Sequence, residues 1–142
     1  MRDDEWTAMT PEECQALLGR HQVGRIAVVD DGRPLIVPVN YVLDDGEVVF
    51  RTGRGTKLDA ALRGSPVAFE IDGFDDSTRT GWSVLVRGRA HRVTEDDELA
   101  RVRRLPLVPW APGDRPHFVT IRAGQTSGRR IRLPDIPPLS WG

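Results

Sequence analysis

The chain has 142 residues, 39% of them hydrophobic and 29% charged, with a net charge of -1 and a pI near 6.3. This length suits one domain with a single core, and the near-neutral charge provides no basic field to attract nucleic acid. Cys14 is the only cysteine, which excludes an internal disulfide and a cysteine-based metal cage. The acidic N-terminus does not resemble a signal peptide, and no apolar run approaches the ~20 residues of a membrane helix. We therefore expect a cytoplasmic protein without a membrane or nucleic-acid partner.

The first predicted elements are a short helix and a three-stranded meander. Thr10 can cap a helix that begins at Pro11 and carries two acids in its first turn. Asp-Asp-Gly turns at residues 30–32 and 44–46 then separate three β-rich runs, a pattern typical of antiparallel hairpins.

The middle run of this meander contains two prolines, Pro34 and Pro38. Proline cannot donate a ladder hydrogen bond, so we expect an irregular or edge segment around both positions. The sequence VPVNYV, residues 37–42, would then expose backbone groups that a flat polar heterocycle could bind. An edge strand that merely tolerates two prolines is the alternative interpretation.

The second half of the chain predicts two further helices and the remaining strands. Thr56 and Thr94 are the expected N-caps, and each precedes a short amphipathic pattern. Gly88 interrupts a long strand and indicates a bend or bulge. The segments HFVTIRA and RRIRL are expected to be two closing strands, and the tail after residue 133 to be irregular.

Six or seven antiparallel strands joined mostly by tight turns, with three short helices, predict a mainly β fold, namely a small β-barrel. No linker or repeat divides the chain. Residues 1–142 are therefore expected to form one domain with an ordered core of about residues 10–133.

The segment RTGRGTK, residues 51–57, indicates an anion site. Its two glycines free backbone amides, its two threonines supply hydroxyls, a helix follows, and Lys57 is the only lysine of the chain. The spacing fits neither the Walker loop nor the dinucleotide fingerprint. An ordinary strand-to-helix turn with solvated basic residues remains the alternative.

Other candidate side chains give weaker indications. Trp82 and Trp110 could stack on a ligand, although tryptophans in a core of this size usually pack. The three histidines lack the spacing of a metal site, so we expect no bound metal. No serine lies in a hydrolase motif, and we assign no catalytic residue.

Taken in order, four segments resemble the pyridoxamine 5′-phosphate oxidase-like family, whose members bind flavins or deazaflavins on the FMN-binding split-barrel fold: VGRIAVVDDGRPLIVPVNYV, EVVFRTGRGTKLDAAL, PVAFEID and GWSVLVRGRA. The resemblance covers nearly all of residues 10–133. It implies a homodimer with a flavin in each groove between the two barrels. The expected function is that of an FMN-dependent oxidoreductase acting on a small organic substrate.

The resemblance also implies which residues contact the flavin. The phosphate would lie among residues before and at the start of the second helix: Arg51, Thr52, Thr56 and Lys57. The isoalloxazine ring would lie against backbone groups of the proline-containing strand: Val37, Pro38, Val39, Asn40 and Tyr41. Side chains from later segments would border the flavin, the last of them from the other subunit: Trp82, Ser83 and Trp110.

Several alternatives accompany this hypothesis. The same fold could bind the 8-hydroxy-5-deazaflavin coenzyme F-420, with its acidic tail along arginines such as Arg54 or Arg79. FAD and haem are further alternatives, and a protein that binds such a group without catalysis is an alternative of another class. Arg51 stands where nitroimidazole-resistance members commonly have histidine, and the tail lacks the basic residues with which the true oxidase recognises its substrate. We therefore expect neither of those two substrates.

Overall fold

The computed structural model describes residues 6–53, 55–62, 64–108 and 115–132. The elements within these ranges are, in chain order, β1 (Trp6–Ala8), α1 (Pro11–Arg20), β2 (Val23–Asp30), β3 (Arg33–Asp44), β4 (Glu47–Thr52), α2 (Lys57–Ala61), β5 (Pro66–Asp75), β6 (Thr80–Arg92), α3 (Asp96–Val102) and β7 (His117–Arg132). The mainly β class with short helices is confirmed. The short strand β1 was not expected.

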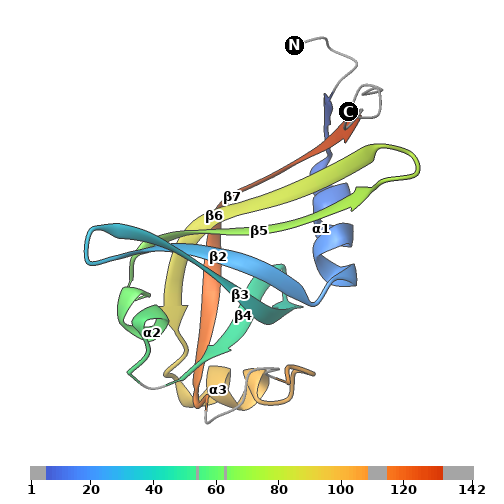
Figure 1. Cartoon of the computed structure of the whole chain (residues 1–142). Helices are drawn as coiled ribbons and strands as arrows, with labels where there is room; N and C mark the ends of the chain where they lie inside the picture. Colours follow the sequence, from blue (N-terminus) through green and yellow to red (C-terminus); the bar gives the residue numbers. More distant parts are fainter. Residues whose placement is uncertain (1–5, 54, 63, 109–114, 133–142) are drawn as a thin grey trace.

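The strands form one antiparallel sheet in the order β1-β7-β4-β3-β2-β5-β6 (Figure 1). An additional pairing between β7 and β6 closes six of these strands into a barrel. Along its other edge β7 pairs with β4 near its start and with β1 near its end. The predicted antiparallel split barrel is therefore confirmed.

The two Asp-Asp-Gly sequences form the tight turns that the sequence predicts. Asp31 and Gly32 have φ of 50° and 75°, and Asp45 and Gly46 have φ of 51° and 80°. Positive φ at both central residues defines the type I′ turn, whose twist matches that of the flanking strands. These turns fix the register of β2 with β3 and of β3 with β4.

Both prolines of β3 lie where the strand has one neighbour. Residues 33–40 of β3 pair with β2, whereas the pairing with β4 begins at Tyr41. In a two-residue hairpin the residues that flank the turn form a hydrogen-bonded pair, and the pairs then alternate. Pro34 and Pro38 consequently fall in non-hydrogen-bonded pairs with β2, and their missing N–H groups remove no ladder bond. The predicted edge segment is confirmed.

The core has two parts, one on each face of β4. Inside the barrel lie the fully buried side chains of Ile26, Phe50, Phe69 and Ile121, with Leu18 of α1 packed at one side. A smaller cluster lies outside, where α3 covers residues of β4 and β7: Val49, Val102 and Phe118. No helix within the described ranges is both long and apolar enough to cross a membrane.

Two details differ from the sequence predictions. α3 begins at Asp96 with Glu95 as its N-cap and without a side-chain cap, so the assignment of Thr94 as the cap was wrong. The two expected closing strands form one continuous strand, β7, because residues 125–128 between them also pair with β6. A register shift of one residue next to Gly88 leaves Gly124 as the extra residue. This shift is the irregularity predicted at Gly88.

Gly88 allows β6 and β7 to approach closely, and we expect Gly88→Ala to destabilise the fold by about 2 kcal/mol or more. A Cβ at this position would lie 2.2 Å from the carbonyl oxygen of Arg122, a backbone atom that strand pairing holds in place. Urea unfolding measures the change. In the matched variant Gly124→Ala the nearest atom is 3.6 Å away, so its stability should change by less than about 1 kcal/mol. Equal losses in the two variants would contradict this explanation.

Candidate functional site

One outer face of the barrel collects predicted residues from two distant strands. Residues directly opposite each other in neighbouring strands share a face, and Pro38, Arg25, Glu70 and Leu85 form such a row across β3, β2, β5 and β6. Asn40 lies two positions from Pro38, and Ser83 two positions from Leu85, so both point to this same face. We call the face carrying this row the outer face.

The outer face becomes apolar toward the turn between β2 and β3. Val29 and Ile36 are 60% and 66% exposed there, a large fraction for aliphatic side chains. A groove of about 830 Å³ crosses the same face over β2, β5, β6 and β7. Small or apolar residues form much of its lining: Ala27, Val29, Pro34, Pro66, Ala68 and Gly88. The groove has the size and chemistry of an organic ligand site.

Three residues of β3 that are predicted to contact the ring through their backbone have side chains that point into the barrel. Val37 packs against the core, Val39 is buried, and Tyr41 is 1% exposed. The Tyr41 hydroxyl donates a hydrogen bond of 2.6 Å to the carbonyl of Leu18, and burial raises the pKa of Tyr41 to about 12. These side chains are structural.

The backbone groups of neighbouring β3 residues point toward opposite edges of the strand. Val37 and Val39 fall in hydrogen-bonded pairs with β2, so their N–H and C=O groups point toward that strand. Pro38 has the opposite direction, and its carbonyl points toward the edge that β4 leaves open. Among these three residues, Pro38 is therefore the one whose backbone can face a ligand at that edge.

Arg51 and Thr52 lie on opposite sides of β4. The Arg51 guanidinium lies 5.0 Å from the ring centroid of Phe118 on the outside, and its Nε donates to the carbonyl of Arg115 at 2.9 Å. Thr52 is fully buried and points inward. The alternation of a β-strand therefore separates two residues that the sequence predicts in one phosphate site.

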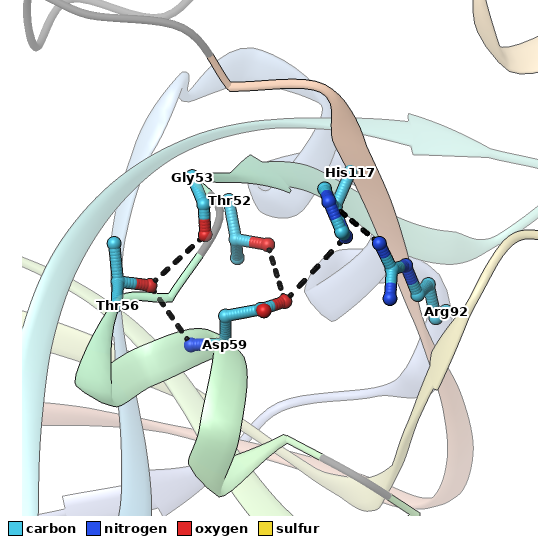
Figure 2. Close-up of polar contacts among 6 residues, drawn as sticks. All are labelled: Thr52, Gly53, Thr56, Asp59, Arg92 and His117. Carbon is cyan, nitrogen blue, oxygen red and sulfur yellow. Dashed lines mark hydrogen bonds and ion pairs between the residues drawn. The ribbon is translucent and has the colours of Figure 1, made fainter.

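The start of α2 holds a compact set of hydrogen bonds (Figure 2). Thr56 is the N-cap: its Oγ1 accepts from the amide of Asp59 at 3.0 Å and donates to the carbonyl of Gly53 at 3.2 Å. The Thr52 hydroxyl donates to Asp59 Oδ1 at 3.3 Å. Lys57 is the first residue of the helix. The structure thus brings Thr52, Thr56 and Lys57 together, with Asp59 among them.

His117 and Arg92 extend this set across two strands (Figure 2). Arg92 Nη2 lies 2.6 Å from His117 Nε2, and because guanidinium only donates, Nε2 is the acceptor. The other ring nitrogen, Nδ1, is buried, 3.7 Å from Asp59 Oδ1, and without a hydrogen-bond partner among the described residues. Within the described part of the chain, no three His, Cys, Asp or Glu side chains are grouped to hold a metal.

Of the two tryptophans predicted to contact the flavin, Trp82 lies near the start of β6 and Trp110 falls outside the described residues. Trp82 packs partly against the core, with its ring 4.9 Å from that of His21. It is therefore closer to the end of α1 than to the start of α2. Trp110 falls outside the residues that the structure describes.

Glu70 and Asp72 form a charged cluster with Arg25 on the outer face. Arg25 Nη1 lies 3.5 Å from Glu70 Oε1 and 3.2 Å from Asp72 Oδ2. Burial raises the pKa of Glu70 to about 7, and Asp72 adds to the rise while Arg25 opposes it. A carboxyl group that titrates near neutrality thus lies beside Arg25, the cross-strand partner of Pro38.

Comparison with known proteins identifies the family. A family model described as pyridoxamine 5′-phosphate oxidase matches residues 10–130. The chain belongs to the pyridoxamine 5′-phosphate oxidase family. An uncharacterised protein of Mycobacterium tuberculosis, Rv0080, is 37% identical over 125 residues, which are 84% of this chain and 82% of the relative.

Two solved structures are also similar to this member of the pyridoxamine 5′-phosphate oxidase family. The FAD binding protein from Mycobacterium smegmatis is 36% identical with a TM-score of 0.78, and the match covers 89% of this chain and 99% of that one. A FAD-binding protein from Mesorhizobium loti is 26% identical with a TM-score of 0.70, and the match covers 90% and 98% of the two chains. The resemblance seen in the sequence is therefore confirmed at the level of family and fold.

Sequence reasoning did not single out Asp59, His117, Arg92 or Glu70. Thr56 and Asp59 have the spacing of a helix N-cap and its third residue, a pattern that could have indicated Asp59. His117, Arg92 and Glu70 come close to their partners through strand pairing, and such pairing leaves no local pattern in the sequence.

The pH dependence of stability should reveal the environment of Glu70. Its pKa is about 7 in the fold against an ordinary 4.5, so between these values the unfolded chain loses a proton that the folded chain retains. Stability is therefore lost as the pH rises through this window, and Glu70→Gln should remove that loss. Because the side chain is 36% exposed, we expect a difference of at most about 1 kcal/mol between pH 5 and pH 8.

Urea unfolding of both proteins at the two pH values measures this difference. Glu12→Gln removes one of the two exposed acids of α1 and provides the control, in which the loss of stability that depends on Glu70 should persist. A profile for Glu70→Gln that parallels the native one would show that Glu70 titrates normally.

Proposed function

We propose that the chain binds a flavin on its outer face and acts as an oxidoreductase on a small organic molecule. The observation that supports this proposal is the open edge of β3. Over residues 33–39 no described strand pairs with this edge, and a groove of about 830 Å³ on the outer face reaches β3 at Pro34. A flat heterocycle with a polar rim fits apolar walls beside free peptide groups.

FMN is the cofactor that the sequence predicts, and FAD is the second candidate because two similar proteins are FAD-binding. Both carry a phosphate at the same place on the ribityl chain. We place that phosphate near Lys57 at the start of α2, where the positive charge can attract it. The deazaflavin alternative has less support, because Arg79 lies in the turn between β5 and β6, at the opposite end of that hairpin from α2 (Figure 1).

A bound flavin would supply the redox chemistry, and the protein would hold the ring and limit access to it. In this proposal the Pro38 carbonyl accepts a hydrogen bond from the polar rim of the ring. Ser83 offers a further polar group on the same face, and Glu70 can hold or release a proton near neutral pH. A protein that binds flavin without turnover is the alternative.

We further propose a homodimer formed through the outer face. Val29 and Ile36 expose large aliphatic surface next to the groove, and burying such a patch between two copies is favourable. A second copy would also close the groove and exclude water from the flavin ring.

Flavin binding can be tested on the protein as isolated. We expect an absorbance spectrum of bound flavin, or saturable binding of added flavin, with the released molecule identified by mass spectrometry. Lys57→Ala should weaken FMN and FAD by about tenfold while leaving riboflavin, which lacks phosphate, nearly unchanged. Equal losses for all three ligands would remove Lys57 from the phosphate site. A protein that binds none of them would end the proposal.

The dimer should depend on the apolar part of the outer face. We expect the native protein to sediment at twice the chain mass of 15.8 kDa and Ile36→Glu to sediment as a monomer. Val108→Glu is the control, since Val108 is 79% exposed but belongs neither to the row that defines the outer face nor to the lining of the groove. Analytical ultracentrifugation distinguishes the two masses. A native monomer, or an Ile36→Glu dimer, would contradict this interface.

A further inference from the structure

We propose that Arg87 binds the carboxylate of an apolar organic molecule that lies in the groove of the outer face, and that such carboxylic acids are the substrates of the site. That the bound molecule is a substrate rests on the proposed flavin site. A carboxylate held at Arg87 would fix one end of the molecule and leave its apolar body on the side of the groove that leads to β3.

The groove is apolar at one end and basic at the other. Toward β2 and β3 its walls include Val29 and Pro34, whereas toward β6 and β7 it is lined by four basic side chains: Arg87, Arg89, His91 and Arg122. No Asp or Glu is among the described residues that line it. A ligand with an apolar body and a negative group at one end therefore complements both parts of the groove.

Arg87 is the arginine of this group that is best placed to receive an anion. Arg89 Nη1 already donates to the carbonyl of Gly64 at 2.9 Å, and Arg122 Nη2 lies 4.0 Å from Glu98 Oε2. Arg87 is exposed and makes neither a hydrogen bond nor an ion pair with any residue in the described part of the chain. Its guanidinium can therefore present two parallel N–H groups, which match the two oxygens of one carboxylate.

The acids of the outer face do not neutralise Arg87. Glu70 and Asp72 both contact Arg25, at 3.5 Å and 3.2 Å. Glu70 lies opposite Leu85, in the row next to that of Arg87, and no ion pair joins either acid to Arg87. The guanidinium therefore keeps its charge for a ligand.

Strand pairing places Arg87 in line with the apolar part of the groove. Across β3, β2, β5 and β6, the residues opposite one another are Ile36, Ala27, Ala68 and Arg87. Three strand spacings separate Ile36 from Arg87, a distance of about 14 Å between the backbones. Because the two residues between them are alanines, the sheet leaves room for an apolar molecule between the proposed flavin ring at β3 and the guanidinium.

The bulge next to Gly88 opens the same end of the groove. Gly124 is the extra residue of β7 at the bulge, and it lines the groove together with Arg87. The extra residue of a bulge is left out of the strand ladder, and bulges are common beside ligand sites because they redirect neighbouring side chains. Since Gly124 has no side chain, the bulge itself does not cover this end of the groove.

Ligands that share a naphthalene body and differ in their polar group test the inference. By isothermal titration calorimetry of the full chain, we expect naphthylacetate to bind at least about tenfold more tightly than the uncharged naphthylethanol. Naphthylethylamine, which carries a positive charge, should bind more weakly than the alcohol. Arg87→Gln should remove the preference for the acid and leave the affinity for the alcohol within about twofold. Arg87→Lys keeps the charge without the planar fork and should retain part of the preference.

Arg129→Gln is the control, because Arg129 is an exposed arginine of β7 that does not line the groove, and this variant should keep the native preference. Titration of the native chain and of Arg87→Gln with FMN and riboflavin should give equal affinities in the two proteins. No binding of naphthylacetate, or equal affinity of the native chain for the acid and the alcohol, would overturn the role of Arg87.

The flavin titrations separate this inference from the proposed function. A loss of affinity in Arg87→Gln for FMN but not for riboflavin would overturn the inference, because the basic end of the groove would then hold the phosphate of the cofactor. A native chain that prefers naphthylacetate through Arg87 but binds neither flavin would keep the carboxylate site and overturn the proposed function.

Discussion

Closure of the barrel depends on the pairing of β6 with β7. These strands remain in register from Thr80 opposite Arg132 to Arg92 opposite Val119, with one shift next to Gly88. The opposite edge of β7 holds β4 at its start and β1 at its end, so this strand joins the two ends of the sheet. Without it the sheet would expose two edges and an open apolar interior. The outer face and the polar cluster at α2 both keep their geometry because this closure is continuous.

Strand alternation then decides what each residue can do. Neighbours in the sequence, such as Arg51 and Thr52, face opposite sides of β4, one over Phe118 and the other inside the barrel. Pro38 faces outward beside Arg25, whereas Val39 joins the core. In a segment such as VPVNYV, alternate residues therefore face opposite sides of the sheet and have different roles. Its outward members can contact a ligand, and its inward members hold the strand in place.

The sequence predicts those parts of the fold that depend on local chemistry. Type I′ turns at Asp-Asp-Gly, the cap at Thr56 and the irregularity at Gly88 each follow from the conformations open to a few residues, and all are present. The prediction of a cap at Thr94 was wrong because α3 begins one residue later, with Glu95 in extended conformation as the N-cap and without a side-chain bond. His117 reaches Asp59, and Glu70 reaches Arg25, through strand pairing. Such contacts depend on the register of distant strands, which no short pattern records.

The two regions of the proposed site differ in how their polar groups are satisfied. At Pro38 no described strand pairs with the open edge of β3, so the carbonyl there can receive a ligand without first losing a ladder bond. At α2 the hydroxyls of Thr52 and Thr56 are already bonded within the chain. A ligand bound as proposed would therefore gain more from its ring at β3 than from any hydroxyl contact at α2. The threonine hydroxyls that the sequence assigns to a phosphate are the part of the proposed site least ready to receive one, because each would first have to give up a bond within the chain.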